Sequence, residues 1–98
     1  MRRPILSPDV VRQLRKLRAG ERRSLLHAMQ ERLAEEDPTV ETRNRFRLRR
    51  TSTHADYELR AGDLRAFFRV ESDGQVYVAL IGRKVGNRLL VEGEEFDL

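Results

Sequence analysis

The apolar positions of the first forty residues follow a helical period. Val10, Val11, Leu14 and Leu17 fall on one face of a helix. Ser7-Pro8-Asp9 before them is a helix start, because a serine caps, a proline fits the first turn and an aspartate suits the positive end of the helix dipole. We therefore expect a helix that begins after Ser7, preceded at Ile5-Leu6 by the end of a strand.

A second helix is predicted from about Glu21 to Glu35, after a break at Ala19-Gly20 and before a stop at Asp37-Pro38. Its apolar stripe consists of Leu25, Leu26, Met29 and Leu33. His27 lies near this stripe and is interpreted as a partly buried structural histidine. Two amphipathic helices joined by a few residues predict an antiparallel helical hairpin whose apolar stripes must be covered.

The second half of the chain changes to a period of two, which is typical of strands. Strands are expected around 45–49, 57–60, 64–70, 75–81 and 89–91, with turns at Gly62-Asp63 and 72–74 and a strand end at Gly82. Short connections make neighbouring strands antiparallel. The predicted fold is α+β, a single domain over 1–98, in which an N-terminal helical hairpin packs on a small antiparallel β-sheet. The helices cover one face of the sheet and the other face is left for function.

Composition narrows the chemistry. The chain has no cysteine, which excludes disulfides and thiolate metal sites, and His27 and His54 show no metal-ligand spacing. No phosphate-binding glycine loop is present. No apolar run approaches the roughly 20 residues that span a bilayer, and the first residues lack the apolar stretch of a signal peptide. We expect a cytoplasmic protein with no metal, no cofactor and no membrane partner.

Charge is distributed unevenly along the chain. Residues 1–50 hold 14 Arg or Lys against 7 Asp or Glu, whereas residues 51–98 hold 6 against 9. Eighteen of the 20 basic residues are arginine, whose planar guanidinium group suits phosphate and carboxylate. This bias favours an anionic partner, although codon usage in a GC-rich genome accounts for it equally well.

The segment from Tyr57 to Val70, followed by an apolar strand over 76–81 and by Gly82-Arg83-Lys84, resembles the RelE/ParE toxin superfamily. The segments 42–45 and 86–95 resemble one branch of these toxins. The resemblance covers nearly the whole chain, because the Ser-Pro-led helical hairpin belongs to it as well.

The resemblance implies a toxin of a type II toxin–antitoxin pair, neutralised by a cognate antitoxin protein and in contact with operator DNA only through the antitoxin complex. The leading hypothesis is a RelE-like, ribosome-dependent endonuclease that cleaves mRNA without a metal. The alternative is a ParE-like inhibitor of DNA gyrase that catalyses no cleavage. A third hypothesis is a decayed or purely regulatory partner.

The resemblance also implies candidate catalytic residues. Arg65 stands where the RelE branch carries its strand arginine, and Arg83 and Lys84 stand at its glycine-adjacent basic pair. Asp56 and Glu58 occupy the positions of two lysines, and Leu90 replaces a C-terminal tyrosine. Because of these departures, the chain lacks the best-defined set of cleavage residues of the RelE branch.

Two further side chains could supply the missing chemistry, His54 as a group that titrates near neutrality and Glu58 as a base. The simpler interpretations are an exposed loop residue for His54 and a cross-strand ion-pair partner of Arg65 or Arg69 for Glu58. Arg65 and Arg69 could likewise only pair with carboxylates. The observation that bears most on the cleavage hypothesis is whether Arg60, Arg65, Arg83 and His54 converge in one basic concavity.

The densest basic segment is 43–50, with Phe46 and Leu48 expected to face inward and three arginines outward. The candidate RNA-binding residues are Arg43, Arg45, Arg47, Arg49, Arg60 and Arg69. Such a patch grips phosphate with little sequence preference, or binds acidic residues of an antitoxin. The acidic tail, formed by Glu92, Glu94, Glu95 and Asp97, is either a solvated end or a shield over a basic surface.

Overall fold

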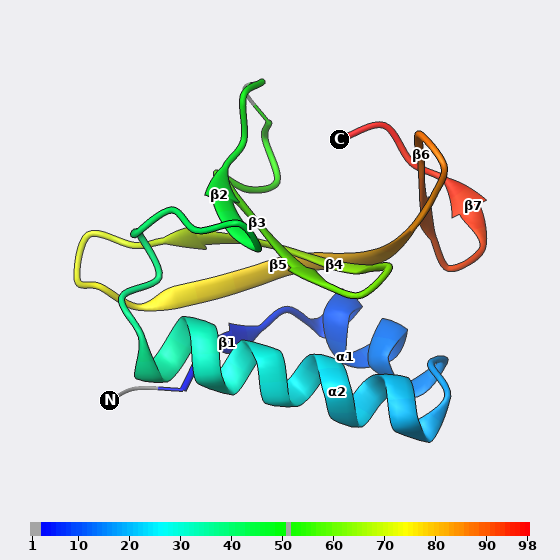
Figure 1. Cartoon of the computed structure of the whole chain (residues 1–98), viewed down its shortest axis with the longest axis horizontal. Helices are drawn as coiled ribbons and strands as arrows, with labels where there is room; N and C mark the ends of the chain where they lie inside the picture. Colours follow the sequence, from blue (N-terminus) through cyan, green and yellow to red (C-terminus); the bar gives the residue numbers. More distant parts are fainter. Residues whose placement is uncertain (1–2, 51) are drawn as a thin grey trace.

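The computed structural model describes residues 3–50 and 52–98, and it confirms a small α+β domain with two helices and an antiparallel sheet (Figure 1). Its elements are β1 (Ile5–Leu6), α1 (Pro8–Arg15), α2 (Ala19–Met29), a π-helical continuation η1 (Gln30–Glu35), β2 (Arg45–Arg47), β3 (Tyr57–Ala61), β4 (Leu64–Val70), β5 (Val76–Val85), β6 (Arg88–Val91) and β7 (Glu94–Glu95). None of the described helices is long and apolar enough to cross a membrane.

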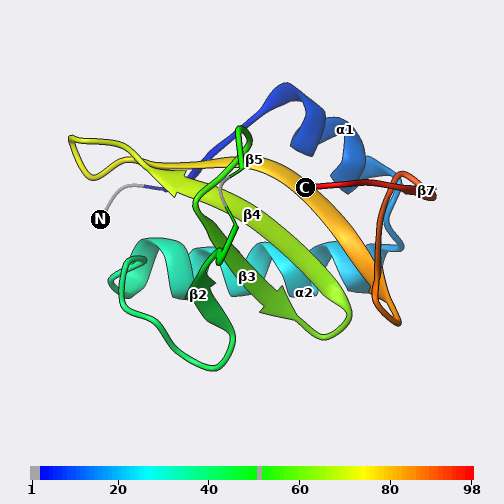
Figure 2. The same ribbon diagram turned by 90° about the horizontal axis from the view of Figure 1, so that it is seen from above.

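The sheet has the strand order β2-β3-β4-β5-β6-β7, and each of these neighbours is antiparallel. The short strand β1 adds a parallel pairing with β5, which the sequence did not indicate. Figures 1 and 2 show both helices on one face of this sheet.

The first helix begins as predicted, because Ser7 Oγ accepts a 3.1 Å hydrogen bond from the backbone N–H of Val10. The predicted break at Ala19-Gly20 is wrong, since these two residues form the first turn of α2. Glu21 accepts a 3.4 Å hydrogen bond from the backbone N–H of Arg18, so the helix starts two residues earlier than its apolar stripe suggests. The prediction for His27 is also wrong, because its side chain is 77% exposed and lies 3.7 Å from Glu31.

The larger apolar core lies between the helices and the sheet. It is built from Val10, Leu14, Leu25, Ala28, Met29, Leu33, Leu59, Leu64, Ala66, Phe68, Val76, Val78 and Ile81. In β4 the expected alternation holds, with Leu64, Ala66 and Phe68 on this face and Phe67 on the other. The face toward the helices is called the helix face below, and the opposite one the outer face.

The outer face is less open than expected, because a second apolar cluster covers part of it. Ala55, Phe67, Leu80, Leu89 and Val91 form this cluster, and Leu48, Phe96 and Leu98 pack against it. The loop before β3 and the C-terminal segment thus lie over the sheet, as the red end of the ribbon shows in Figure 1.

The predicted strand end at Gly82 is wrong, since β5 continues to Val85. A Cβ atom at Gly82 would lie 2.8 Å from the backbone oxygen of Leu90 and 2.9 Å from a Leu89 methyl group. Glycine is needed here because β6 approaches the backbone closely, not because the strand stops.

The acidic tail is neither wholly solvated nor wholly a shield. Glu92 pairs with Arg12 at 3.1 Å and with Lys16 at 2.9 Å, which ties the end of β6 to α1. Hydrogen bonds from Arg12 and Lys16 lower the pKa of Glu92 to about 2. Glu92 lies in the turn between β6 and β7 with a φ of 54°, a left-handed conformation that residues other than glycine rarely adopt.

Candidate functional site

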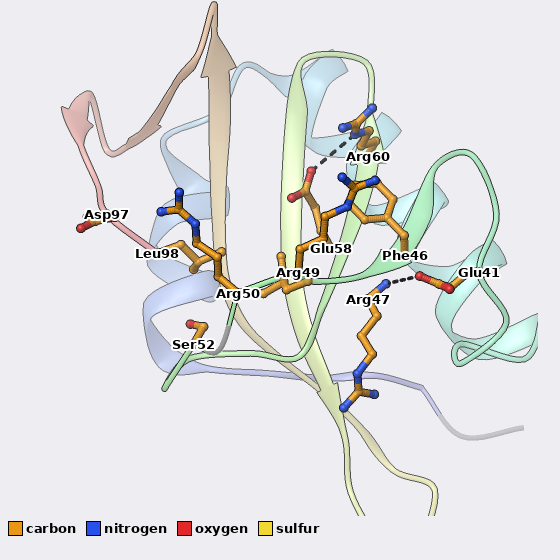
Figure 3. Close-up of a pocket in the computed structure, with 11 residues that line it drawn as sticks. Glu41, Phe46, Arg47, Arg49, Arg50, Ser52, Glu58, Arg60, Asp97 and Leu98 are labelled. Carbon is orange, nitrogen blue, oxygen red and sulfur yellow. Dashed lines mark hydrogen bonds and ion pairs between the residues drawn. The ribbon is translucent and has the colours of Figure 1, made fainter.

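A groove of about 590 Å³ opens on the outer face, between the segment after β2, the strand β3 and the C-terminal segment (Figure 3). Its lining residues are Glu41, Phe46, Arg47, Leu48, Arg49, Arg50, Ser52, Glu58, Arg60, Asp97 and Leu98. Four of these side chains are arginines, so the groove concentrates guanidinium groups on the face opposite the helices.

The centre of the site is an ion-pair triad formed by Glu58, Arg60 and Arg65. Glu58 and Arg60 alternate with the buried Leu59 on β3, so both side chains emerge on the outer face. Arg65 lies directly across from Arg60 on β4. Oε2 of Glu58 is 3.2 Å from Nε of Arg65 and 3.4 Å from Nε of Arg60. One carboxylate is therefore shared by two guanidinium groups.

Arg65 is held firmly in this position. Its Nη1 donates 2.8 Å hydrogen bonds to the backbone oxygens of Gly62 and Leu64, and its side chain is only 11% exposed. Burial lowers the pKa of Arg65, Glu58 opposes this shift and Arg60 adds to it. Because a guanidinium group in a protein remains protonated, Arg65 is a largely desolvated cation.

Arg49 and Phe46 complete the cationic end of the groove. The guanidinium group of Arg60 lies 4.8 Å from the ring centre of Phe46, a cation–π contact. Figure 3 shows Arg49 extending from the segment after β2 toward Glu58 and Arg60. The structure gives Arg49 no ion-pair partner within residues 3–50 and 52–98. The guanidinium groups around Glu58 thus carry more positive charge than its single carboxylate neutralises.

The expected convergence is met for Arg60 and Arg65 but not for Arg83. Arg83 pairs across the sheet with Leu64, which faces the larger core, so its side chain emerges on the helix face. There it makes 2.8 Å ion pairs with Glu21 and Asp63. Placing Arg83 with Arg65 was wrong, because residues that end neighbouring strands face opposite sides when their register differs by one.

His54 and Lys84 also lie outside the groove. The His54 ring makes an edge-on contact with Phe96, with 5.3 Å between ring centres, and its side chain is exposed. Lys84 pairs with Leu89 near the second apolar cluster and is not among the lining residues. Neither residue touches the triad.

Arg45 is the clearest correction in the predicted basic patch. It is buried, with 2% exposure, and it donates hydrogen bonds of 2.8 Å to the backbone oxygens of Val40 and Arg32. Its Nη1 also lies 2.7 Å from a carboxylate oxygen of Glu36. Arg45 satisfies one carbonyl group of η1 and one of the loop that follows it, and Phe46 consequently faces the groove rather than the core.

The remaining predicted RNA-binding arginines divide into different settings. Arg47 donates a 3.2 Å hydrogen bond to the Tyr57 hydroxyl, and Figure 3 shows its guanidinium group pointing away from the triad. Arg69 lies 4.2 Å from the ring centre of Tyr77 and pairs with Glu71 at 2.9 Å. Arg43 is exposed and does not line the groove.

Sequence reasoning missed the contributions of Glu41, Phe46, Asp97 and Leu98 to the groove. Only the pairing of Phe46 with Glu58 places Phe46 on the outer face, and no local pattern indicates that pairing. Asp97 reaches the groove because the chain folds back over the sheet after β6.

Among the described residues, no group of three or more His, Cys, Asp or Glu side chains is arranged to hold a metal ion. Comparison of the sequence with models of protein families and with curated proteins finds no match.

Proposed function

We propose that this chain is a RelE/ParE-class toxin of a type II toxin–antitoxin pair, a ribosome-dependent mRNA endonuclease that a cognate antitoxin neutralises. The observation that carries the proposal is the excess of guanidinium groups on the outer face, where Arg49, Arg60 and Arg65 surround Glu58. The family resemblance supplies the target, and the cytoplasm is the compartment where that target lies.

The chemistry of such a groove suits a phosphodiester. Arginine binds phosphate oxygens in a fork and stays charged, so Arg60 and Arg65 would stabilise the negative charge of a pentavalent phosphorane. Glu58 would accept the proton of the attacking 2′-hydroxyl. The P–O2′ bond forms, the P–O5′ bond breaks and the 5′-oxygen takes a proton from solvent. The products are a 2′,3′-cyclic phosphate and a 5′-hydroxyl.

This site is smaller than the one expected from the sequence. Arg83, Lys84 and His54 take no part in it, because Arg83 pairs with Glu21 and Asp63, and the other two lie outside the groove. The proposed reaction therefore depends on the triad of Glu58, Arg60 and Arg65.

The separation of Arg83, Lys84 and His54 from the triad favours a second candidate function, a ParE-like toxin that inhibits DNA gyrase by binding alone. In that case the groove would bind acidic side chains of its target or antitoxin, and Glu58 would serve only as an ion-pair partner of Arg60 and Arg65.

Expression of the chain without its antitoxin distinguishes these functions. The endonuclease proposal predicts growth arrest with cuts at codon boundaries in translated messages, and rescue when the antitoxin is co-expressed. Arg60→Ala should abolish the cuts, whereas Arg43→Ala, outside the groove, should not. Growth arrest with intact messages and accumulated cleaved DNA–gyrase complexes would establish the alternative. Normal growth at full expression would contradict both.

A further inference from the structure

We propose that Arg60 and Arg65 form an oxyanion site for a phosphodiester of single-stranded RNA, and that Glu58 occupies this site in the free protein as an internal competitor. The choice of RNA as the ligand rests on the proposed function; the competition between Glu58 and an external anion rests on the geometry of the triad.

Arg60 and Arg65 are direct cross-strand partners, so their side chains emerge next to each other on the outer face. A single oxygen, Oε2 of Glu58, lies 3.2 Å from one Nε and 3.4 Å from the other. It stands where a phosphate oxygen would bind.

Glu58 lines the groove, whereas Arg65, which contacts Glu58 from β4, does not. The carboxylate thus separates Arg65 from the groove. A ligand that binds both arginines has to displace it.

Nε of Arg65 is buried and has no hydrogen-bond partner, although Oε2 of Glu58 lies only 3.2 Å away, because the N–H bond does not point at that oxygen. A buried donor left without an acceptor is unfavourable, so an anion free to align with it has an advantage over the tethered carboxylate. Burial lowers the pKa of Arg65 and the neighbouring Arg60 adds to this shift, whereas Glu58 and Asp63 oppose it.

Displacement would also have a chemical consequence. A phosphate seated between Arg60 and Arg65 leaves the Glu58 carboxylate beside it and released from both ion pairs. In this way binding of the substrate would itself free Glu58 to act as the base of the proposed reaction. Without substrate, Glu58 would remain paired with Arg60 and Arg65.

The test measures affinity for a fluorescent single-stranded oligonucleotide with 2′-O-methyl groups, which cannot be cleaved. Glu58→Gln should bind it about tenfold more tightly than the unaltered chain. The slope of log affinity against log salt should steepen by about 0.7, the value for one added phosphate contact on a single strand. Asp97→Asn removes one negative charge from the same groove and is the matched control. It should gain about twofold, as expected of screened electrostatics, with no change in slope.

Equal gains for Glu58→Gln and Asp97→Asn would overturn the proposal, since they would reflect net charge and no occupied site. A thermal unfolding curve of each variant establishes that it is folded. A second measurement uses the unaltered chain and so does not depend on Glu58→Gln or Asp97→Asn. The Nε–H resonance of Arg65 should shift saturably when inorganic phosphate is added. Arg60→Ala should weaken that response severalfold. An unchanged resonance would contradict the proposal.

The outcomes separate this inference from the proposed function. Tighter binding by Glu58→Gln in a chain that never cuts messages would support the oxyanion site and refute the endonuclease. Codon-boundary cuts without tighter binding by Glu58→Gln would support the endonuclease and refute the competitor role of Glu58.

Discussion

The arginines of the helix face and those at the groove of the outer face are used in opposite ways. On the helix face, Arg45 and Arg83 make ion pairs with Glu36, Glu21 and Asp63, and Arg45 is buried as well. On the outer face, two guanidinium groups share one carboxylate and Arg49 adds a third. The number of arginines in a segment therefore says little about function. What distinguishes them is whether the fold supplies each with a carboxylate of its own.

The largest difference between the two faces is expected in how much their apolar residues contribute to the free energy of unfolding. Phe68 has no exposed surface and lies in the larger core, so Phe68→Ala should lower the free energy of unfolding by about 3–5 kcal/mol. Phe46 is half-buried at the groove, and Phe46→Ala should cost about 1 kcal/mol or less while weakening RNA binding. Urea unfolding of both variants measures the difference. Similar losses would mean that the outer face is as important to stability as the helix face.

A smaller effect is expected from the arginines themselves. Arg45→Ala leaves the carbonyl groups of Val40 and Arg32 without their donor and should lower the free energy of unfolding by about 1–3 kcal/mol. Arg49→Ala should change stability by less than about 0.5 kcal/mol and reduce oligonucleotide affinity severalfold. Unfolding and binding titrations of the two variants check this. A loss of affinity in folded Arg45→Ala with none in Arg49→Ala would reverse the assignment.

The smallest effect is expected from the ion pairs of Glu92 with Arg12 and Lys16, which connect the end of β6 to α1. Arg12 and Lys16 lower the pKa of Glu92 from its ordinary value of 4.5 to about 2. Because the pKa is lower in the folded state, this contribution to stability is complete above about pH 4.5 and is lost as the pH falls toward 2. The melting temperature of the unaltered chain should therefore fall more steeply over that interval than that of Glu92→Gln. Parallel curves would contradict the role of this ion pair.

The elements that local patterns determine were predicted well from the sequence. The cap at Ser7 and the alternation over 64–70 depend on neighbours within a few residues, and both are found in the structure. The start of α2 and the length of β5 were misjudged, because glycine marks a helix start at Gly20 and a close strand approach at Gly82, not a break.

The candidate site was predicted only in part. The ion pair of Glu58 with Arg65 was foreseen and is confirmed, whereas the roles of Glu58, Arg60 and Arg65 in binding or catalysis stay predictions. The sequence did not predict the burial of Arg45 or the face of the sheet on which the Arg83 side chain lies. These features depend on where η1 ends and on the register between β4 and β5. Neither of these long-range features leaves a local trace in the sequence.

The most direct test of the account is a map of where RNA touches the protein. Titration with a short single-stranded oligonucleotide, followed by backbone amide resonances, should perturb residues around the groove, at 46–50 and 58–65. The segment 15–23, which includes the connection between α1 and α2 and is also rich in basic residues, should stay unchanged. Perturbations confined to that segment, with the groove unaffected, would contradict the claim that the surplus arginines of the outer face form the binding site.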